Sequence, residues 1–182
     1  LIPAITAQVL DAARASGATV IVPGNVYVYG NQPGPWGAET PHVPCSRKGA
    51  IRAEMEAQYR ASGLPVILLR GGDFVDETSA GTFLNMVTLK GLAKGKLTIA
   101  GTPDVQRAYA YLPDMARVAV ALAERRAELP RFADIPYAGL SISMADLKAE
   151  IERQSGRKLR YTQMLWGMMR LLSPVWELTR EL

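Results

Sequence analysis

The pattern of apolar and polar residues along the first third of the chain predicts helices that alternate with strands. Residues 3–16 are rich in alanine and predict a helix that ends at Gly17, with one apolar side formed by Ile5, Val9, Ala12 and Ala13. Residues 46–62 predict a second helix, in which Ile51, Met55 and Tyr59 recur every fourth position.

Two short runs between and after these helices predict buried strands. Residues 18–23 (ATVIVP) and 65–70 (PVILLR) are apolar without alternation, which is typical of strands covered on both faces in a parallel sheet. The intervening segment 24–43 holds four Gly and three Pro and predicts a loop. Strand, helix and strand at this spacing form a βαβ unit, and ligands bind at loops that follow the carboxyl ends of such strands.

The rest of the chain predicts shorter, mixed elements. They are a loop over 71–81, a helix near 82–93, a strand at 97–101, a helix over 112–126, a strand at 132–139, a helix over 143–154 and a strand at 159–164. Ser143 and Asp146 have the spacing of a capping box, and Gly156 is placed to end that helix. The tail, 165–182, is too apolar to lie free in water.

Two strong parallel strands are too few for a stable open sheet, because both edges would stay unpaired. Residue 1 is Leu rather than Met. We therefore expect the chain to be the carboxyl-terminal portion of a longer α/β protein.

Composition restricts the function classes. Hydrophobic residues make up 48% and charged residues 21% of 182, which is a globular balance, and a single Cys excludes an internal disulfide and a cysteine-based zinc site. The net charge of +4 comes from basic residues that mostly alternate with acidic ones along helices, so we expect no nucleic-acid partner.

No apolar run approaches the roughly 20 residues of a membrane span, and the first residues lack a signal-peptide pattern. We expect a cytoplasmic protein with no membrane partner.

Lys48 stands in the first turn of the second predicted helix, with Arg47 beside it. Two cations at this end oppose the helix dipole, at a cost of about 0.3–1 kcal/mol each. Either they are a solvated basic helix end, or Lys48 faces a ligand.

Four segments in order resemble a known family. TVIVPGNVYVYG (19–30), AETPHVPCSRKGAIRAEME (38–56), LPVILLRGGDF (64–74) and RAYAYLPDMARVAVALAE (107–124) are similar to the extended short-chain dehydrogenase/reductases of the NAD-dependent epimerase/dehydratase group. The resemblance implies part of a doubly wound, Rossmann-like parallel sheet with a smaller carboxyl-terminal substrate domain. Residues 1–71 would be the second half of the NAD(P)-binding domain. Residues 72–182 would mostly bind substrate, with some segments returning to the first domain.

The resemblance carries over one catalytic residue and leaves two positions changed. The family's Lys, which holds the nicotinamide ribose, corresponds to Lys48, but its catalytic Tyr corresponds to Pro44 and its Ser or Thr to Asn25. Asn25 can still hydrogen-bond a carbonyl, whereas proline has no proton to give.

Other residues are candidates for the missing proton donor. Tyr27, Tyr29, His42 and Cys45 all lie in or beside the loop, although tyrosines there also pack loops against sheets and a lone His is also a solvated surface residue. We predict a catalytic set of Lys48, Asn25, Tyr27 and His42, with no metal.

The resemblance also implies residues that contact ligands. For NAD or NADP these are Pro23, Gly24, Asn25, Lys48, Gly71, Gly72 and Asp73, and for the substrate they are Tyr29, Phe74 and Arg107. Asp73 corresponds to a family Asn near the nicotinamide, and otherwise is a turn residue. Arg107 corresponds to an arginine that meets a nucleotide-sugar phosphate, and otherwise forms a salt bridge to Asp104 or Asp114.

The resemblance implies an atypical NAD(P)-dependent epimerase, dehydratase or reductase that acts on a small molecule bearing a hydroxyl or carbonyl group, with nucleotide sugars as one substrate class. The alternative is a non-catalytic NAD(P)-binding or sensing protein. The family's glycine-rich pyrophosphate loop is absent from this sequence. Family members commonly pair through two helices, which here correspond to 4–16 and 46–62, so we expect a homodimer.

Overall fold

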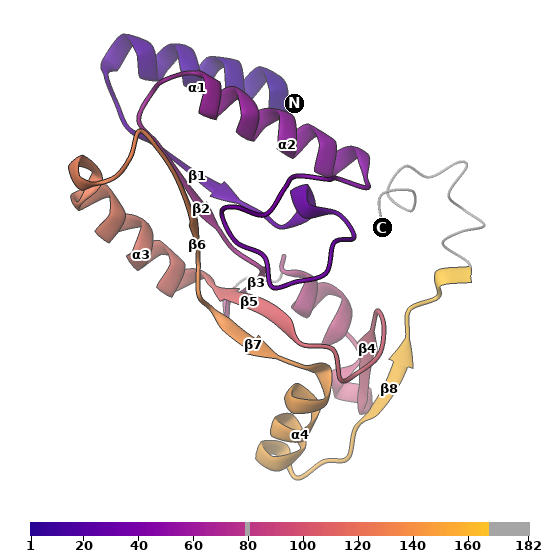
Figure 1. Cartoon of the computed structure of the whole chain (residues 1–182). Helices are drawn as coiled ribbons and strands as arrows, with labels where there is room; N and C mark the ends of the chain where they lie inside the picture. Colours follow the sequence, from indigo (N-terminus) through magenta and orange to yellow (C-terminus); the bar gives the residue numbers. More distant parts are fainter. Residues whose placement is uncertain (79–80, 168–182) are drawn as a thin grey trace. The chain divides into compact units, whose positions relative to one another are not determined.

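A computed structural model describes residues 1–78 and 81–167 and divides the chain into two compact units (Figure 1). The first unit comprises Leu1–Gly71 and Asp114–Ala138. The second comprises Gly72–Pro113 and the described part of Gly139–Leu182. The first unit has one sheet and the second has two.

Three parallel strands form the sheet of the first unit, in the order β1 (Val20–Gly24), β2 (Val66–Arg70), β6 (Phe132–Pro136). The central strand β2 is buried along its whole length, as its unbroken apolar run predicts. The expected α/β class with a parallel sheet is therefore confirmed, and the strand-like segment 132–139 supplies the third strand.

Helices α1 (Ile2–Ser16) and α2 (Arg47–Ala61) lie side by side and pack on β1 and β2, whereas α3 (Leu112–Glu124) lies apart from them (Figure 1). Leu10 of α1 and Met55 and Tyr59 of α2 join the strand residues in one core. Gly17 ends α1 in the left-handed conformation, at φ 68°, as predicted.

The buried face of α1 matches the predicted one only in part, since Ala13 is buried and Val9 packs against the core as predicted. Thr6, Leu10 and Ala13 face inward, while Ile5 is 46% exposed. The two faces are almost equally apolar, and Thr6 enters the core because its hydroxyl donates to the Ile2 carbonyl, 2.9 Å away. The sequence therefore predicts the helix and part of its buried side, but not the inward positions of Thr6 and Leu10.

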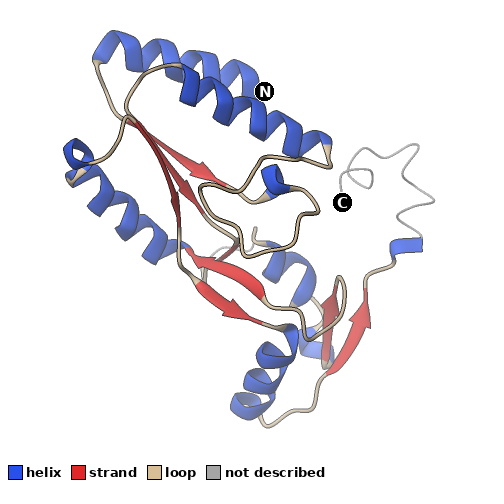
Figure 2. Cartoon of the chain, viewed as in Figure 1, coloured by secondary structure: helices blue, strands red, loops and turns tan. Residues whose placement is uncertain are grey.

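The second unit holds two small sheets and a helix (Figure 2). In one sheet, β5 (Arg107–Tyr111) pairs parallel to β3 (Asp73–Val75) and antiparallel to β7 (Leu140–Ile142). In the other, β4 (Lys96–Ile99) and β8 (Arg160–Gln163) run parallel. Helix α4 (Met144–Ser155) packs on both, since Met144 forms a core with Ile99 and Tyr109.

Three predictions for the second unit need correction. Residues 71–81 were expected to be a loop but contain β3, and β5 and β7 were not predicted as strands. Residues 82–93 form a π-helical turn at Leu84–Thr88 and a 3-10 turn at Leu92–Lys94 instead of one α-helix. The strands β3 and β7 have three residues each, which is too short for a periodic signal, and Gly91 interrupts the expected helix over 82–93.

The predicted cap of α4 is confirmed. Ser143 and Asp146 form a capping box, and Gly156 ends the helix with φ 67°. Most of the apolar tail, residues 168–182, lies outside the described residues. In the part of the chain that the structure describes, no helix combines the length and apolar character needed to cross a membrane.

Candidate functional site

The long loop between β1 and α2 carries three of the four predicted catalytic residues (Figure 1). It begins at Asn25, whose Oδ1 accepts a hydrogen bond from the Tyr27 amide at 3.0 Å. A short 3-10 turn, Tyr27–Tyr29, follows. This Asx-type turn sets the direction of the loop directly after the strand.

Two glycines let the loop fold back on itself and onto α2. Gly30 has φ 62°, and a Cβ there would overlap the Val43 carbonyl oxygen. A Cβ on Gly49, in the first turn of α2, would lie 2.6 Å from the Tyr27 carbonyl oxygen. The loop backbone therefore approaches the amino end of α2 more closely than any other residue type would allow.

Lys48 is exposed in this first turn of α2, next to exposed Arg47. Ser46 caps the helix, because its hydroxyl accepts a hydrogen bond from the Gly49 amide at 3.1 Å. The predicted helix and the place of Lys48 in it are thus confirmed. A ligand-facing role for Lys48 stays a prediction.

The three ring-bearing candidates in the loop differ in exposure. Tyr27 is 54% exposed, whereas Tyr29 is 1% exposed and its hydroxyl donates to the Gly37 carbonyl at 3.0 Å. Burial raises the pKa of Tyr29, so its phenol stays protonated at neutral pH. The His42 side chain is 27% exposed and lies edge-on to the Tyr29 ring, with 5.8 Å between the ring centroids. Tyr29 thus packs inside the loop, and its substrate contact stays a prediction.

The remaining predicted residues of the first unit lie around the carboxyl ends of β1 and β2. Pro23 is exposed, Gly24 is buried, and the Gly71 amide donates to the Gly24 carbonyl at 3.2 Å. Pro44 is half-buried beside Gly49, and Cys45 is exposed with its thiol 3.4 Å from Asn31 Oδ1.

A buried ion cluster underlies this loop and was not predicted. Arg70, at the end of β2, has all five guanidinium N–H groups in hydrogen bonds. Nε donates to Asp134 Oδ1 (3.2 Å), Nη2 to Asp134 Oδ2 (2.7 Å) and Glu56 Oε2 (2.8 Å), and Nη1 to Glu56 Oε1 (3.2 Å) and the Asn25 carbonyl (2.5 Å). We call Arg70, Glu56 and Asp134 the Arg70 cluster.

The charges in the Arg70 cluster are strongly coupled. Burial alone would lower the pKa of Arg70, but its hydrogen bonds to Glu56 and Asp134 and their negative charges raise the pKa above its ordinary value. Arg70 is therefore a permanent cation. Its guanidinium also lies over the Tyr29 ring, 5.0 Å from the centroid, which ties the loop to the cluster.

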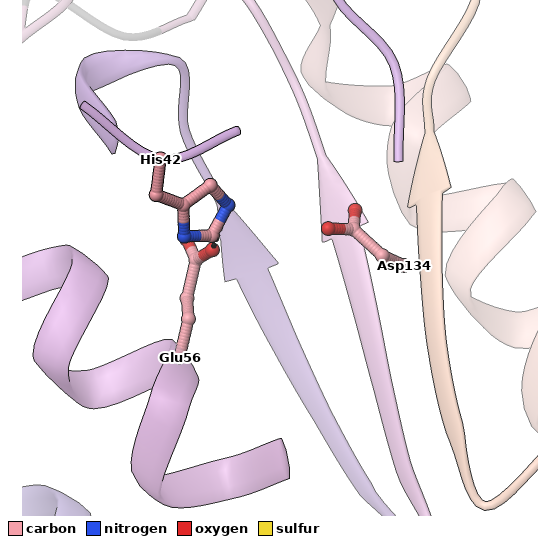
Figure 3. Close-up of side chains that lie close together, drawn as sticks. All are labelled: His42, Glu56 and Asp134. Carbon is pink, nitrogen blue, oxygen red and sulfur yellow. Dashed lines mark ion pairs between the residues drawn. The ribbon is translucent and has the colours of Figure 1, made fainter. Parts of the chain in front are cut away.

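His42 extends the cluster toward solvent. Figure 3 shows its ring beside Glu56, with Nε2 3.5 Å from Glu56 Oε2, and shows Asp134 nearby. Ligand atoms of His42, Glu56 and Asp134 lie within 4.8 Å of one another, a spacing that would suit a metal ion. The Arg70 guanidinium already contacts both carboxylates, so the cation that these acids hold is Arg70.

The sequence offers only a weak signal for this cluster. Arg70 is a charged residue that ends an otherwise apolar strand, and Asp134 interrupts another short apolar strand. Such residues are buried only when paired. Glu56 looks like any acid on an amphipathic helix, so the pairing depends on tertiary contacts that a sequence pattern does not contain.

The second unit holds the other predicted ligand contacts. Asp73 begins β3 and accepts a hydrogen bond from Arg107 Nη2 at 2.9 Å, so the predicted salt bridge of Arg107 exists but its partner is neither Asp104 nor Asp114. Parallel pairing of β3 with β5 brings these two residues together. Phe74 is 38% exposed and Gly72 is half-buried, where a Cβ would overlap the Ala108 carbonyl oxygen.

The fold and this loop can now be compared with known proteins. Residues 4–135 match the model of the "NAD dependent epimerase/dehydratase family". The chain belongs to this family. No curated protein sequence matches the chain significantly.

Solved structures of similar fold include several nucleotide-sugar enzymes. One is a UDP-glucuronic acid 4-epimerase from Bacillus cereus, in complex with UDP-glucuronic acid and NAD. It superposes with a TM-score of 0.74 and 20% sequence identity, and the match covers 88% of this chain and 53% of the epimerase chain. MoeE5 in complex with UDP-glucose and NAD has TM-score 0.73, 18% identity and coverage of 87% and 56%. A dTDP-glucose 4,6-dehydratase from Bacillus anthracis in complex with NAD has TM-score 0.70, 16% identity and coverage of 87% and 54%.

At these identities the likeness shows the fold. The chain spans about half the length of the structures that it matches.

Proposed function

We propose that this chain is part of an NAD(P)-dependent epimerase, dehydratase or reductase of atypical type, which acts on a hydroxyl- or carbonyl-bearing small molecule such as a nucleotide sugar. The observation that carries the proposal is the place of Lys48, exposed in the first turn of α2 beside the loop that follows β1, in a chain of this family.

The residues at this place fit the ribose and nicotinamide part of the cofactor. Lys48 offers three N–H donors, and Asn25 offers an amide at the carboxyl end of β1, where ligands of parallel sheets bind. Ribose hydroxyls and a carboxamide need such donors. A bound nicotinamide supplies the hydride chemistry, and the chain's own residues then hold the ribose through Lys48 and orient a carbonyl through Asn25.

Tyr27 is the best placed residue to donate the proton that Pro44 cannot. Its side chain is exposed, its amide is fixed by Asn25, and its carbonyl lies against Gly49, next to Lys48. His42 is directed instead to the buried Glu56, and the Cys45 thiol to Asn31.

Pro44 itself favours the second candidate function, a non-catalytic NAD(P)-binding or sensing protein. Proline at this position has no ionisable group, and it is half-buried against the first turn of α2. In this case Lys48 and Asn25 hold the cofactor, and the protein acts through a partner surface.

Further parts of the proposal concern assembly and location. We place the homodimer contact on α1 and α2, because α1 exposes Ile5 and the alanines at 4, 7, 12 and 15, which would allow a second copy to approach closely. Arg107, with Asp73, is the proposed contact for a substrate phosphate. We place the protein in the cytoplasm, because a single Cys45 without a disulfide partner fits a reducing compartment.

The Tyr27→Phe variant of the full-length protein separates the two candidate functions. With NAD(H) and a panel of nucleotide sugars, we expect turnover to fall about 100-fold or more, the usual scale of a lost proton donor, while NAD(H) affinity changes little. Turnover is followed at 340 nm for reduction and by product chromatography for epimerisation. Unchanged turnover would remove Tyr27 as the donor. Binding without turnover in the wild type would favour the sensing function.

A further inference from the structure

The Arg70 cluster joins three segments of the first unit at one guanidinium. Arg70 ends β2, and its hydrogen bonds reach the Asn25 carbonyl at the start of the loop, Glu56 on α2 and Asp134 on β6. The side chains of all three cluster residues are at least 96% buried. Buried charges of this kind are costly unless every donor finds an acceptor, which is the case for Arg70.

Two of these three contacts are to segments that carry residues of the proposed cofactor site. Asn25 is itself a candidate site residue, and its backbone is held by Arg70 Nη1 at 2.5 Å. Glu56 stands on the same helix as Lys48, eight residues further on, which is about 12 Å along the helix axis. A bidentate pair with Arg70 therefore restricts both the axial position and the rotation of α2, and with them the place of Lys48.

We propose that Arg70 and Glu56 are positioning residues that fix Asn25 and Lys48 relative to each other. The inference rests on the proposed function, in which these two residues hold the cofactor. Neither Arg70 nor Glu56 is exposed enough to touch a ligand, so their effect is exerted through the backbone of Asn25 and through α2. His42 covers the outer side of Glu56 and lies in the same loop.

Asp134 provides a matched control within the same cluster. Like Glu56 it forms two hydrogen bonds to the guanidinium and is buried, but it stands on β6, which carries no predicted site residue. Glu56→Gln and Asp134→Asn each remove one negative charge from the same cation and leave one ion pair. A purely structural cluster would respond to both changes alike.

The test uses the full-length protein with three variants, Glu56→Gln, Asp134→Asn and Arg70→Lys. Arg70→Lys keeps the charge but offers three donors where five are in use. For each variant we measure thermal unfolding, NADH affinity by fluorescence titration, and amide hydrogen exchange in 25–31 and 47–50.

We expect the two carboxylate variants to lower the unfolding midpoint similarly. NADH affinity should fall about 2- to 30-fold in Glu56→Gln and Arg70→Lys, the range for residues that touch no ligand, and by less than about twofold in Asp134→Asn. Exchange in 25–31 should accelerate in Arg70→Lys, and exchange in 47–50 in Glu56→Gln. Equal losses of affinity and equal exchange in the two carboxylate variants would overturn the inference.

Failure of the proposed function and failure of the positioning role give different results in this experiment. If the wild type does not bind NADH, the proposed function fails. The positioning role of Arg70 and Glu56 is then tested by amide hydrogen exchange in 25–31 and 47–50 alone, compared between Glu56→Gln and Asp134→Asn. If Glu56→Gln does not fold, Glu56→Asp takes its place, because it keeps the charge and withdraws the carboxylate by one methylene.

Discussion

At the scale of single residues, the loop between β1 and α2 depends on positions that admit only glycine. Gly30 combines φ 62° with a Cβ position that overlaps the Val43 carbonyl oxygen. Gly17, at the end of α1, has a similar φ of 68° but open space around its Cβ position. Gly17 has ψ 16° and lies in the left-handed helical region, whereas Gly30 has ψ −133° and lies outside it, so both the backbone conformation and the clash favour glycine at position 30.

We predict that Gly30→Ala destabilises the protein more than Gly17→Ala. Gly17→Ala should cost about 1–2 kcal/mol, the penalty of a left-handed conformation. Gly30→Ala should cost more, because it places alanine in a positive-φ conformation outside the left-handed helical region and adds a steric conflict worth about 1–3 kcal/mol. Urea unfolding of the full-length variants measures both free energies. Equal losses would mean that the loop relaxes away from Val43 without cost.

Residue chemistry was predictable from the sequence only where a local motif carries it. Lys48 at a helix start and Asn25 after a strand follow from spacing, and the structure places both residues there. Arg70, Glu56 and Asp134 are separated by up to 78 positions and meet only through the parallel register of β2 and β6 and the packing of α2. No local pattern specifies such a meeting.

At the scale of elements, capping chemistry was the most predictable feature. The Ser143 hydroxyl accepts from the Asp146 amide, and the Asp146 carboxylate accepts from the Ser143 amide and hydroxyl. These hydrogen bonds, the backbone one first, lower the pKa of Asp146 below its ordinary value of 3.8. A lowered pKa in the folded state means that ionised Asp146 stabilises the fold above pH 3.8 and that this contribution is lost as the pH falls further.

Ser143→Ala should therefore destabilise the second unit by about 1 kcal/mol near neutral pH, the usual value of a lost cap. The difference from the wild type should narrow below pH 3.8, because protonation of Asp146 weakens the hydrogen bond from the Ser143 hydroxyl, which only the wild type has, whereas both proteins keep the bond from the backbone amide at 143. Ser155→Ala, at the exposed carboxyl end of α4, is the control and should change little. A difference that stays constant from pH 7 to pH 3 would contradict this account of the cap.

Elements without a repeating pattern were not predictable. The strands β3 and β7 have three residues each, and pairing with β5 rather than their own composition makes them strands. On α1, Ile5 and Leu10 are equally apolar, but only Leu10 faces the sheet. Tertiary packing determines which short segments pair as strands and which face of a helix is buried.

At the scale of the whole molecule, the parallel sheet and the family agree with the sequence. The runs at β1 and β2 predicted the parallel pair, and the ordered segments from 19 to 124 predicted the family whose model matches residues 4–135. The division into units at Gly71, Asp114 and Ala138 follows from a chain that leaves the first unit after β2 and returns for α3 and β6. The roles of the two units in binding cofactor and substrate stay predictions.

The central claim is that Lys48 holds the cofactor, and an NADH titration of the full-length protein tests it most directly. Lys48→Ala should weaken NADH binding about 10- to 100-fold, as expected for a lost hydrogen bond from a charged group, with little change in the unfolding midpoint. Arg47→Ala, which removes the same charge one residue earlier, should bind NADH nearly as well as the wild type. Identical titration curves for Lys48→Ala and the wild type would contradict the account.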